Sequence, residues 1–281
     1  MTAYLERHAV EQPRLASEII IAKSLGINRI DIYACFDRPV SDGELDSIRI
    51  KGRRLAEGEP LQLVVGDAHF LSYIFRVEPG VFIPRPETEI LVETADEYLK
   101  SRTEPPPEQI LDLCTGSGVV AISLLKLIPE ISAEAVDISE KATQLATENA
   151  ASLGVSERFT AYTGDLFTVL KPGTLYDAIL ANPPYISTCD IAATPAVVRN
   201  HDPHASLDGG KDGLDTVRLI IGGAPQFLKS GGLLALEIGI GQADETLRLM
   251  RDGGFSDCKS VKDLAGIERI ISGCLEKPLC T

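Results

Sequence analysis

From Gln109 onward the chain alternates short apolar runs with amphipathic stretches, and this rhythm is the feature that most constrains its fold. Apolar runs of this length, bounded by turn residues, predict buried strands, and the stretches between them have helical spacing. The predicted strands span residues 109–114, 133–137, 159–163, 176–181, 232–238, 255–261 and 267–272. The predicted helices span residues 118–128, 140–153, 213–229 and 241–252. Strands and helices in alternation indicate an α/β domain built on a parallel sheet.

The last two predicted strands are joined too closely for a helical crossover. We therefore expect them to form an antiparallel hairpin at the edge of the sheet. A sheet of seven strands, mostly parallel but with one reversed strand near its edge, resembles that of the class I methyltransferases, which use S-adenosylmethionine.

The part of the chain before residue 67 has a different, helical pattern. Apolar spacing over residues 15–25 predicts one helix, and Ser41 with Glu44 predicts a capping box at the start of another. Alternation over residues 61–82 predicts a strand or hairpin. The expected domains are a helical domain over residues 1–66, a strand or hairpin linker over residues 67–85 and a methyltransferase domain over residues 86–281.

Charge and composition narrow the class of partner. The chain has 41 Asp and Glu against 27 Lys and Arg, a net charge of −14, and such a field repels nucleic acid. The six cysteines never occur as C-x-x-C, so we expect free thiols and no metal site. Charges interrupt the apolar runs well short of a membrane span, and residues 1–8 lack the apolar stretch of a secretory signal. We expect a cytoplasmic protein with no membrane association.

A strand, a glycine-rich turn and a helix start follow one another over residues 110–121. Gly116 and Gly118 would let a ligand approach the helix N-terminus, and Asp137, at the next strand end, can accept two ribose hydroxyl protons. The same spacing fits the dinucleotide fingerprint of a dehydrogenase, or a purely structural turn. Asp112 favours S-adenosylmethionine, because a carboxylate there suits a cationic methionine group and sits badly near a pyrophosphate.

Asp165 and Leu166 follow the third predicted strand. Asp165 can accept a hydrogen bond from an adenine amino group, and Leu166 can pack against the adenine ring. The plain alternatives are a solvated turn at Asp165 and, at Asp137, a helix cap.

The tetrapeptide Asn182-Pro183-Pro184-Tyr185 follows the fourth predicted strand, at the edge where open α/β sheets bind ligands. Its prolines lack N–H donors, so carbonyls and the Asn182 side-chain oxygen remain as acceptors beside the aromatic face of Tyr185. Such a cradle suits the NH₂ group of an amide or exocyclic amine, whose delocalised lone pair makes it a poor nucleophile. Holding its protons orients the nitrogen and stabilises growing positive charge during methyl transfer, without a strong base. A rigid turn without function is the plain alternative.

Motifs spread over nearly the whole chain make it similar to the release factor glutamine methyltransferase family. The matching segments are Pro13-Arg14-Leu15, Gly58-Glu59-Pro60 and residues 82–89, 112–118, 182–185, 205–214 and 263–269. The resemblance implies transfer of a methyl group from S-adenosylmethionine to the side-chain amide of the glutamine in the Gly-Gly-Gln loop of class I peptide chain release factors. It also implies that residues 1–66 recognise the substrate.

The resemblance further implies which residues form the site. The residues expected to bind the cofactor are Asp112, Cys114, Thr115, Gly116, Ser117, Gly118, Asp137, Asp165, Leu166 and Asn182. The residues expected to take part in catalysis are Asn182, Pro183 and Tyr185. Those expected to bind the substrate are Asn182, Pro183, Pro184 and Tyr185.

The sequence departs from the family pattern at three places. Cys114 stands where the family usually has glycine, and Leu166 stands where some members have tryptophan. His201-Asp202-Pro203 stands where members of the family commonly have a glutamate before the proline. The first two departures point to altered cofactor packing, and no role is carried over to His201 or Asp202.

Other functions share some of these features. A ribosomal-protein glutamine methyltransferase would share the catalytic domain and differ in its N-terminal part. A DNA adenine methyltransferase would share the tetrapeptide, but base flipping and phosphate binding need cationic contacts that a net charge of −14 does not indicate. A non-catalytic partner of the translation machinery would bind the cofactor only for stability, and an intact acceptor cradle argues against that.

Overall fold

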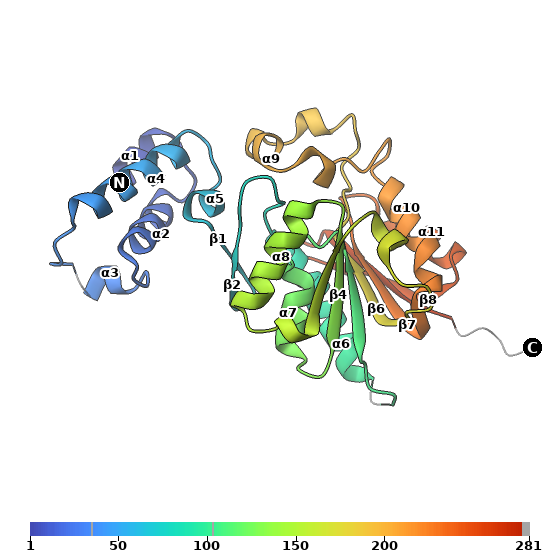
Figure 1. Cartoon of the computed structure of the whole chain (residues 1–281). Helices are drawn as coiled ribbons and strands as arrows, with labels where there is room; N and C mark the ends of the chain where they lie inside the picture. Colours follow the sequence, from blue (N-terminus) through green and yellow to red (C-terminus); the bar gives the residue numbers. More distant parts are fainter. Residues whose placement is uncertain (35, 103, 277–281) are drawn as a thin grey trace, which may run out of the picture.

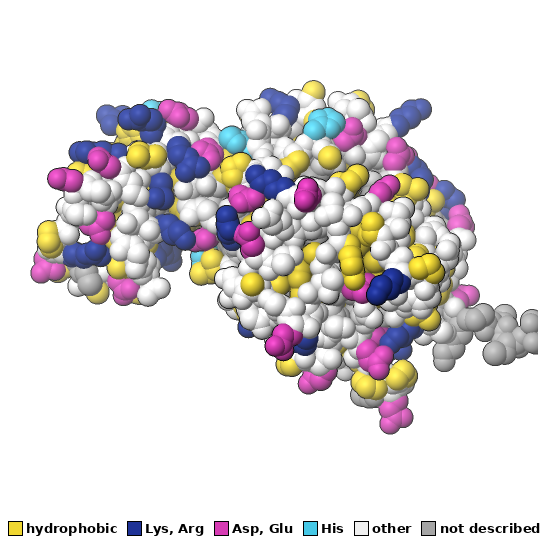
Figure 2. Space-filling view, viewed as in Figure 1, with side chains coloured by type: hydrophobic (Ala, Val, Ile, Leu, Met, Phe, Trp, Pro, Cys, Tyr) yellow, Lys and Arg dark blue, Asp and Glu magenta, His cyan; other side chains and the backbone are white. Residues whose placement is uncertain are grey.

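Residues 1–34, 36–102 and 104–276 are described by the computed structural model, which contains two units of unequal size. Figure 1 shows the N-terminal helices set to one side of a larger sheet domain, with β1 (Asp67–Phe70) and β2 (Tyr73–Arg76) at the junction. Figure 2 shows Lys and Arg side chains spread over the N-terminal unit, with Asp and Glu among them. Among the described residues, no helix combines the length and the apolar character needed to cross a membrane.

The sheet of the larger unit has the strand order β5-β4-β3-β6-β7-β9-β8 in the described residues. Its strands are β3 (Gln109–Leu113), β4 (Ser132–Asp137), β5 (Phe159–Thr163), β6 (Tyr176–Ala181), β7 (Leu228–Glu237), β8 (Phe255–Lys262) and β9 (Glu268–Leu275). The pairs from β5 to β7 are parallel, and β9 runs antiparallel to both β7 and β8. The predicted α/β class is confirmed, with its seven-stranded, mostly parallel sheet and its antiparallel final pair.

Helices cover both faces of this sheet. The helices of the larger unit are α6 (Glu89–Ser101), α7 (Val119–Leu127), α8 (Glu140–Ser152), α9 (Ala196–His201), α10 (Asp215–Gly223) and α11 (Ala243–Asp252). Its short 3₁₀ turns are η1 (Pro86–Thr88), η2 (Ser156–Arg158), η3 (Leu166–Val169), η4 (Ile191–Ala193), η5 (His204–Ser206) and η6 (Ala224–Gln226). Ile110 and Leu180 pack with α6, α7 and α8 on one face, whereas Leu111 and Ile179 pack with α10 and α11 on the other. Burial on both faces explains why these strands are apolar runs in the sequence.

The boundary between α10 and β7 differs from the prediction. The helix predicted over residues 213–229 ends at Gly223, and β7 begins at Leu228 rather than at residue 232. Leu228 pairs with Tyr176, and the register shifts before Leu233 pairs with Ala178. The polar and glycine residues at this irregularity interrupt the apolar pattern, so the first part of the strand is not visible in the sequence.

The N-terminal unit has a hydrophobic core of its own, which includes Leu5, Ile20 and Leu55. Its helices are α1 (Thr2–Arg7), α2 (Pro13–Leu25), α3 (Asp31–Ala34), α4 (Asp42–Ala56) and α5 (Leu61–Val65). The predicted capping box is confirmed, because the side chain of Ser41 accepts from the Glu44 N–H and the Glu44 side chain accepts from the Ser41 N–H.

The predicted strand or hairpin over residues 61–82 is shorter than expected. Its first residues form α5, and the hairpin consists of β1 (Asp67–Phe70) and β2 (Tyr73–Arg76). Phe70 and Phe75 meet edge to face, with ring centroids 6.0 Å apart, and both are buried in the core of the sheet domain. The hairpin is thus packed against the sheet domain through its aromatic side chains.

Candidate active site

A cavity of about 770 Å³ lies at the carboxyl ends of the parallel strands. Its walls include the predicted site residues Asp112, Cys114, Thr115, Gly116, Ser117, Asp137, Asp165, Leu166, Asn182, Pro184 and Tyr185. Gly118 and Pro183 are the two predicted residues outside this lining. The segment that carries α9, above this end of the sheet in Figure 1, contributes Pro195, Val198 and residues 203–208 to the wall.

Two features of the turn between β3 and α7 favour glycine: the backbone conformation at Gly116 and Gly118, and the lack of space for a side chain at Gly118. Gly116 and Gly118 have φ angles of 56° and 85°, which residues with a side chain rarely adopt. A Cβ at Gly118 would also lie 2.7 Å from Ile122 Cδ1 and 3.0 Å from Ala146 Cβ, whereas one at Gly116 would meet nothing within 4 Å. The Gly116 N–H donates to Asp137 Oδ2 over 2.9 Å, which ties the turn to the end of β4.

Asp112, at the end of β3, is 1% exposed. Its Oδ2 accepts from Thr115 Oγ1 at 2.6 Å and from the Ala121 N–H at 3.2 Å, so it also holds the first turn of α7 against the strand. Burial raises the pKa of Asp112 to about 7, with a smaller contribution from the charge of Asp137. A cation in the cavity would favour the ionised carboxylate and would be attracted by it.

Asp137 ends β4 with both carboxylate oxygens engaged. Oδ2 accepts from Gly116, and Oδ1 accepts from the Ser139 N–H at 2.9 Å. Ser139, and not Asp137, is the N-cap of α8, because its hydroxyl accepts from the Ala142 N–H. Burial raises the pKa of Asp137. Since each oxygen has a second lone pair, Asp137 can still accept two hydroxyl protons from a ligand.

Cys114 and Leu166 have positive φ angles of 57° and 46°. Such a conformation costs a residue with a side chain about 1 kcal/mol or more, which explains why glycine suits the position of Cys114. Burial, together with the carboxylates of Asp137, Asp112 and Asp165, raises the pKa of the Cys114 thiol. The thiol therefore stays protonated and is a poor nucleophile.

Residues 182–185, here called the acceptor turn, are held by two buried polar side chains. Asn182 Nδ2 donates to Thr88 Oγ1 at 3.1 Å, and Tyr185 Oη donates to Glu237 Oε1 at 3.4 Å. Burial and the Glu237 carboxylate raise the pKa of the Tyr185 hydroxyl, so the phenol stays protonated. Neither Thr88 nor Glu237 is among the predicted site residues, although a glutamate closing the apolar run of β7 was a signal available in the sequence.

Residues 208–213, together with Gln242, support the backbone of the acceptor turn. The Gly209 N–H donates to the Ile186 carbonyl at 2.8 Å, and Gln242 Nε2 donates to the Tyr185 carbonyl at 2.9 Å. A Cβ at Gly213 would lie only 2.2 Å from the Tyr185 carbonyl oxygen. The sequence pointed to this segment only through the family resemblance. The structure shows that it contacts the backbone of Tyr185 and Ile186.

Asp202 joins the α9 segment to the chain that leads into the site. Its side chain forms an ion pair with Arg85, and its Oδ1 accepts from the Ile83 N–H at 3.3 Å. Burial raises the pKa of Asp202, and the Arg85 charge opposes that effect. Asp202, to which no role was carried over from the family pattern, thus fixes one wall of the cavity.

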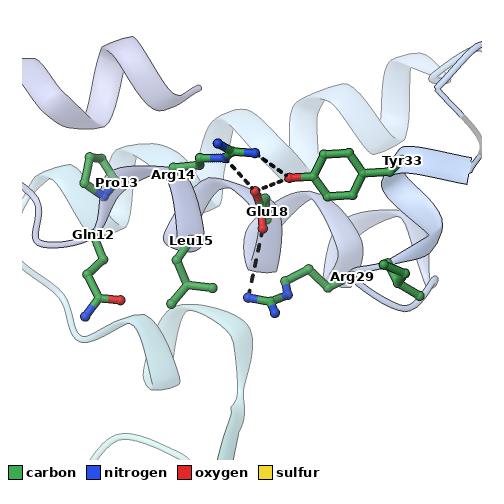
Figure 3. Close-up of a pocket in the computed structure, with 8 residues that line it drawn as sticks. Gln12, Pro13, Arg14, Leu15, Glu18, Arg29 and Tyr33 are labelled. Carbon is green, nitrogen blue, oxygen red and sulfur yellow. Dashed lines mark hydrogen bonds and ion pairs between the residues drawn. The ribbon is translucent and has the colours of Figure 1, made fainter.

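A second cavity, of about 660 Å³, lies in the N-terminal unit between α2 and α3. Figure 3 shows Arg14, Arg29 and Tyr33 directed toward Glu18. Arg14 Nε donates to Glu18 Oε1 at 3.1 Å, Tyr33 also donates to Glu18, and Arg29 Nη1 lies 4.0 Å from Glu18 Oε2. These charges compensate one another, so the cluster joins the two helices and explains the place of Arg14 in the motif Pro13-Arg14-Leu15.

Within the described ranges, no group of three or more His, Cys, Asp or Glu residues is arranged to hold a metal ion. Cys114, Cys189, Cys258 and Cys274 are free thiols, as predicted. Cys35 and Cys280 lie outside the described residues.

The fold is shared with solved methyltransferases. A ribosomal protein L11 methylase from Lactobacillus delbrueckii subsp. bulgaricus matches with a TM-score of 0.53 and 19% identity, over 72% of this chain and 86% of that one. A family model described as "Methyltransferase small domain" matches residues 72–201. The fold, and the cavity at the carboxyl ends of its strands, define a class I methyltransferase.

Sequence comparison specifies the family. A model described as "PrmC N-terminal domain" matches residues 1–66. A release factor glutamine methyltransferase from Geobacter sulfurreducens is 40% identical, over 96% of this chain and 92% of that protein. One from Rhodopirellula baltica is 37% identical over the same shares. The chain belongs to the release factor glutamine methyltransferase family, as its motifs predicted, and is an enzyme of the glutamine methyltransferase class.

Proposed function

We propose that this protein transfers a methyl group from S-adenosylmethionine to the side-chain amide nitrogen of the glutamine in the Gly-Gly-Gln loop of class I peptide chain release factors. The observation that carries the proposal is the orientation of Asn182 in the wall of the cavity. Its Nδ2 is engaged by Thr88, so its Oδ1 is the atom left to accept a proton from an NH₂ group. The names of the relatives support a release factor as the substrate.

The residues of the cavity fit S-adenosylmethionine. Asp137 would receive the ribose hydroxyls, and Asp165 with Leu166 would receive the adenine, as the sequence predicts. Asp112 would attract the cationic methionine end, and the turn at Gly116 has open space where a side chain would otherwise stand. The site requires negative charge near a cation, and Asp112 supplies it.

When bound, S-adenosylmethionine supplies an electrophilic methyl group on a sulfonium. Asn182 Oδ1, in the cavity wall, would accept one amide proton of the glutamine. The carbonyl of Pro183, a residue outside the lining but between Asn182 and Pro184 within it, would accept the other proton, and the two contacts would direct the nitrogen toward the methyl group. Tyr185 would pack against the flat amide. These acceptors also stabilise the positive charge that grows on the nitrogen as the N–CH₃ bond forms and the S–CH₃ bond breaks, so the reaction needs no strong base. The sulfonium would leave as the neutral thioether, and the methylated nitrogen would release one of its two protons to the solvent.

The proposal assigns recognition of the release factor to residues 1–66 and catalysis to residues 86–281, with residues 67–85 between them. It includes a cytoplasmic location and a protein substrate without direct contact to nucleic acid. The charge distribution supports this partner class, because residues 1–66 carry nine Lys and Arg against ten Asp and Glu and offer no excess of cations.

A methyl-transfer assay with labelled S-adenosylmethionine tests the proposal. Release factor, a glutamine-bearing ribosomal protein and adenine-containing DNA are offered separately, and the modified residue is mapped by mass spectrometry. We expect label on the Gly-Gly-Gln glutamine alone. Label on the ribosomal protein or on DNA, with none on the release factor, would contradict the proposal.

Calorimetry tests the cofactor separately. We expect binding of S-adenosylmethionine and of its demethylated product, and weaker binding after Asp137→Ala, by roughly 1.5 to 3 kcal/mol for each charge-assisted hydrogen bond lost. Uptake of NAD in place of both compounds would contradict the methyltransferase assignment of this cavity.

A further inference from the structure

The amide of Asn182 is the end of a buried chain of hydrogen bonds. Asn182 Nδ2 donates to Thr88 Oγ1 at 3.1 Å, and Thr88 Oγ1 donates to Glu237 Oε2 at 2.7 Å. Thr88 and Glu237 are each 2% exposed, so water does not compete for these contacts. The three residues come from the ends of three separate elements, namely β6, η1 and β7.

The direction of each bond in this chain follows from a count of protons. A threonine hydroxyl has one proton, and that of Thr88 is given to the carboxylate of Glu237. The Thr88 oxygen can then only accept, so Asn182 must turn its NH₂ toward it. The Asn182 Oδ1 consequently faces away from Thr88 and remains available as an acceptor.

We propose that Thr88 and Glu237 are positioning residues that set the polarity of the Asn182 amide, and thereby select an NH₂ group as the substrate. The inference rests on the proposed function, because it assigns Asn182 Oδ1 to the glutamine amide. If the Asn182 side-chain amide were rotated so that Oδ1 and Nδ2 exchanged places, its NH₂ would face the NH₂ of the substrate. Two hydrogen-bond donors facing each other repel. Thr88 acts through Asn182, and Glu237 acts through Thr88 and through the hydroxyl of Tyr185, so both are positioning residues and neither is itself a catalytic residue.

The charge of Glu237 determines whether this polarity is enforced. A protonated Glu237 can donate to Thr88, which frees the Thr88 proton and allows Asn182 to present its carbonyl to Thr88. Around Glu237 lie Glu87, which opposes its ionisation, Arg269, which favours it, and the hydroxyl of Tyr185. Burial raises the pKa of Glu237 to about 7. Because the ionised form is the one that enforces the polarity, the rate of methyl transfer should rise with pH through this range.

The test compares three variants with the wild type in single-turnover methyl transfer to the release factor, at saturating cofactor, from pH 5.5 to 9. Thr88→Val keeps the shape and removes the hydroxyl, so we expect a loss of about 10- to 100-fold at high pH and no rise through pH 7. Thr88→Ser should recover most of the rate and the pH dependence. Glu237→Gln keeps an acceptor for Thr88 but cannot titrate, so its rate should not rise through pH 7.

Thr94→Val is the matched control. Thr94 is a buried threonine on α6 whose hydroxyl donates to the Ile90 carbonyl at 2.7 Å, outside the chain of bonds to Asn182. We expect it to change stability without changing the rate per folded molecule. A similar rate loss in Thr94→Val, or an unaltered rate and pH profile in Thr88→Val, would overturn the inference.

A titration of Glu237 by carbon NMR gives a readout that needs no turnover. The Thr88 hydrogen bond stabilises the carboxylate, so Thr88→Val should raise the pKa of Glu237 above that of the wild type. Thr88→Ser should leave that pKa near the wild-type value. An unchanged pKa of Glu237 in Thr88→Val would overturn the inference. Because this measurement needs no turnover, it tests the inference even if the wild type methylates no release factor and the proposed function is wrong.

Discussion

At the scale of single residues, Asn182→Ala removes the acceptor at the centre of the proposed site. Losing one preorganised contact to a reacting group costs on the order of 10² to 10³ in rate, so we expect most turnover to be lost. The cofactor affinity should change far less, because the role proposed for the Asn182 amide serves the substrate more than the cofactor. Single-turnover kinetics and calorimetry on the same preparation measure the two effects.

Asn182→Asp is the stricter companion to this variant. It keeps the size and an acceptor oxygen, but a carboxylate cannot donate to Thr88 and adds a charge that attracts the cationic end of the cofactor. We expect a folded and impaired enzyme. Near wild-type rates in both variants would mean that methyl transfer does not depend on the acceptor turn.

Single residues also mark the limit of prediction from the sequence. Asp112, Asp137 and Asn182 could be predicted because each follows an apolar run that ends at the binding edge of a parallel sheet. Thr88 could not be connected to Asn182, because 94 residues separate them and only tertiary packing brings them together. The place of Asn182 in the cavity wall was thus predictable from the sequence, whereas its hydrogen bond to Thr88 and, through Thr88, its link to Glu237 were not.

At the scale of elements, the bounds of a strand could be predicted where its apolar run was unbroken, and were missed where polar residues or a short helix interrupted the pattern. β6 lies buried along its whole length and was predicted with its observed bounds, 176–181. The start of β7 was missed because its irregular register follows a polar segment. α5 was taken as part of a strand because five residues are too few to separate helical from alternating spacing.

Residues 208–213 lie so close to the acceptor turn that Gly213 has no room for a side chain. Gly213→Ala adds a Cβ that would lie 2.2 Å from the Tyr185 carbonyl oxygen, at a φ of 78°. The acceptor turn must shift to make room, so we expect a loss of about 1 to 3 kcal/mol in the free energy of unfolding. The rate of methyl transfer should fall with it. Denaturant unfolding and single-turnover kinetics measure these changes.

Gly222→Ala is the control for that variant. Gly222 lies in α10, and a Cβ there would meet nothing within 4 Å. Alanine should stabilise the helix by up to about 1 kcal/mol and leave the rate unchanged. If Gly213→Ala were as harmless as this control, the segment could not be what holds the acceptor turn in place.

At the scale of the whole molecule, the two units touch through an apolar contact and through an ion pair between Lys23 of α2 and Asp67 of β1. Leu63 of α5 packs with Ala68, Val77 and Ile83 beside the hairpin, and the Val77 N–H donates to the Gly66 carbonyl at 3.1 Å. The N-terminal unit otherwise has its own core. Removing residues 1–59 would therefore leave α5 to cover the hairpin while taking away most of the proposed recognition surface.

We expect this truncated chain to bind S-adenosylmethionine as the full chain does and to lose methylation of the intact release factor. A short peptide containing Gly-Gly-Gln has no further surface to offer, so its kcat/KM should be similar for the truncated and full chains. For the intact factor, kcat/KM should fall tenfold or more, which corresponds to at least about 1.4 kcal/mol of lost recognition. Thermal unfolding with and without the cofactor establishes that the truncated chain is folded. Equal losses on peptide and intact factor, or unchanged kinetics on the factor, would show that the N-terminal unit serves a purpose other than recognition.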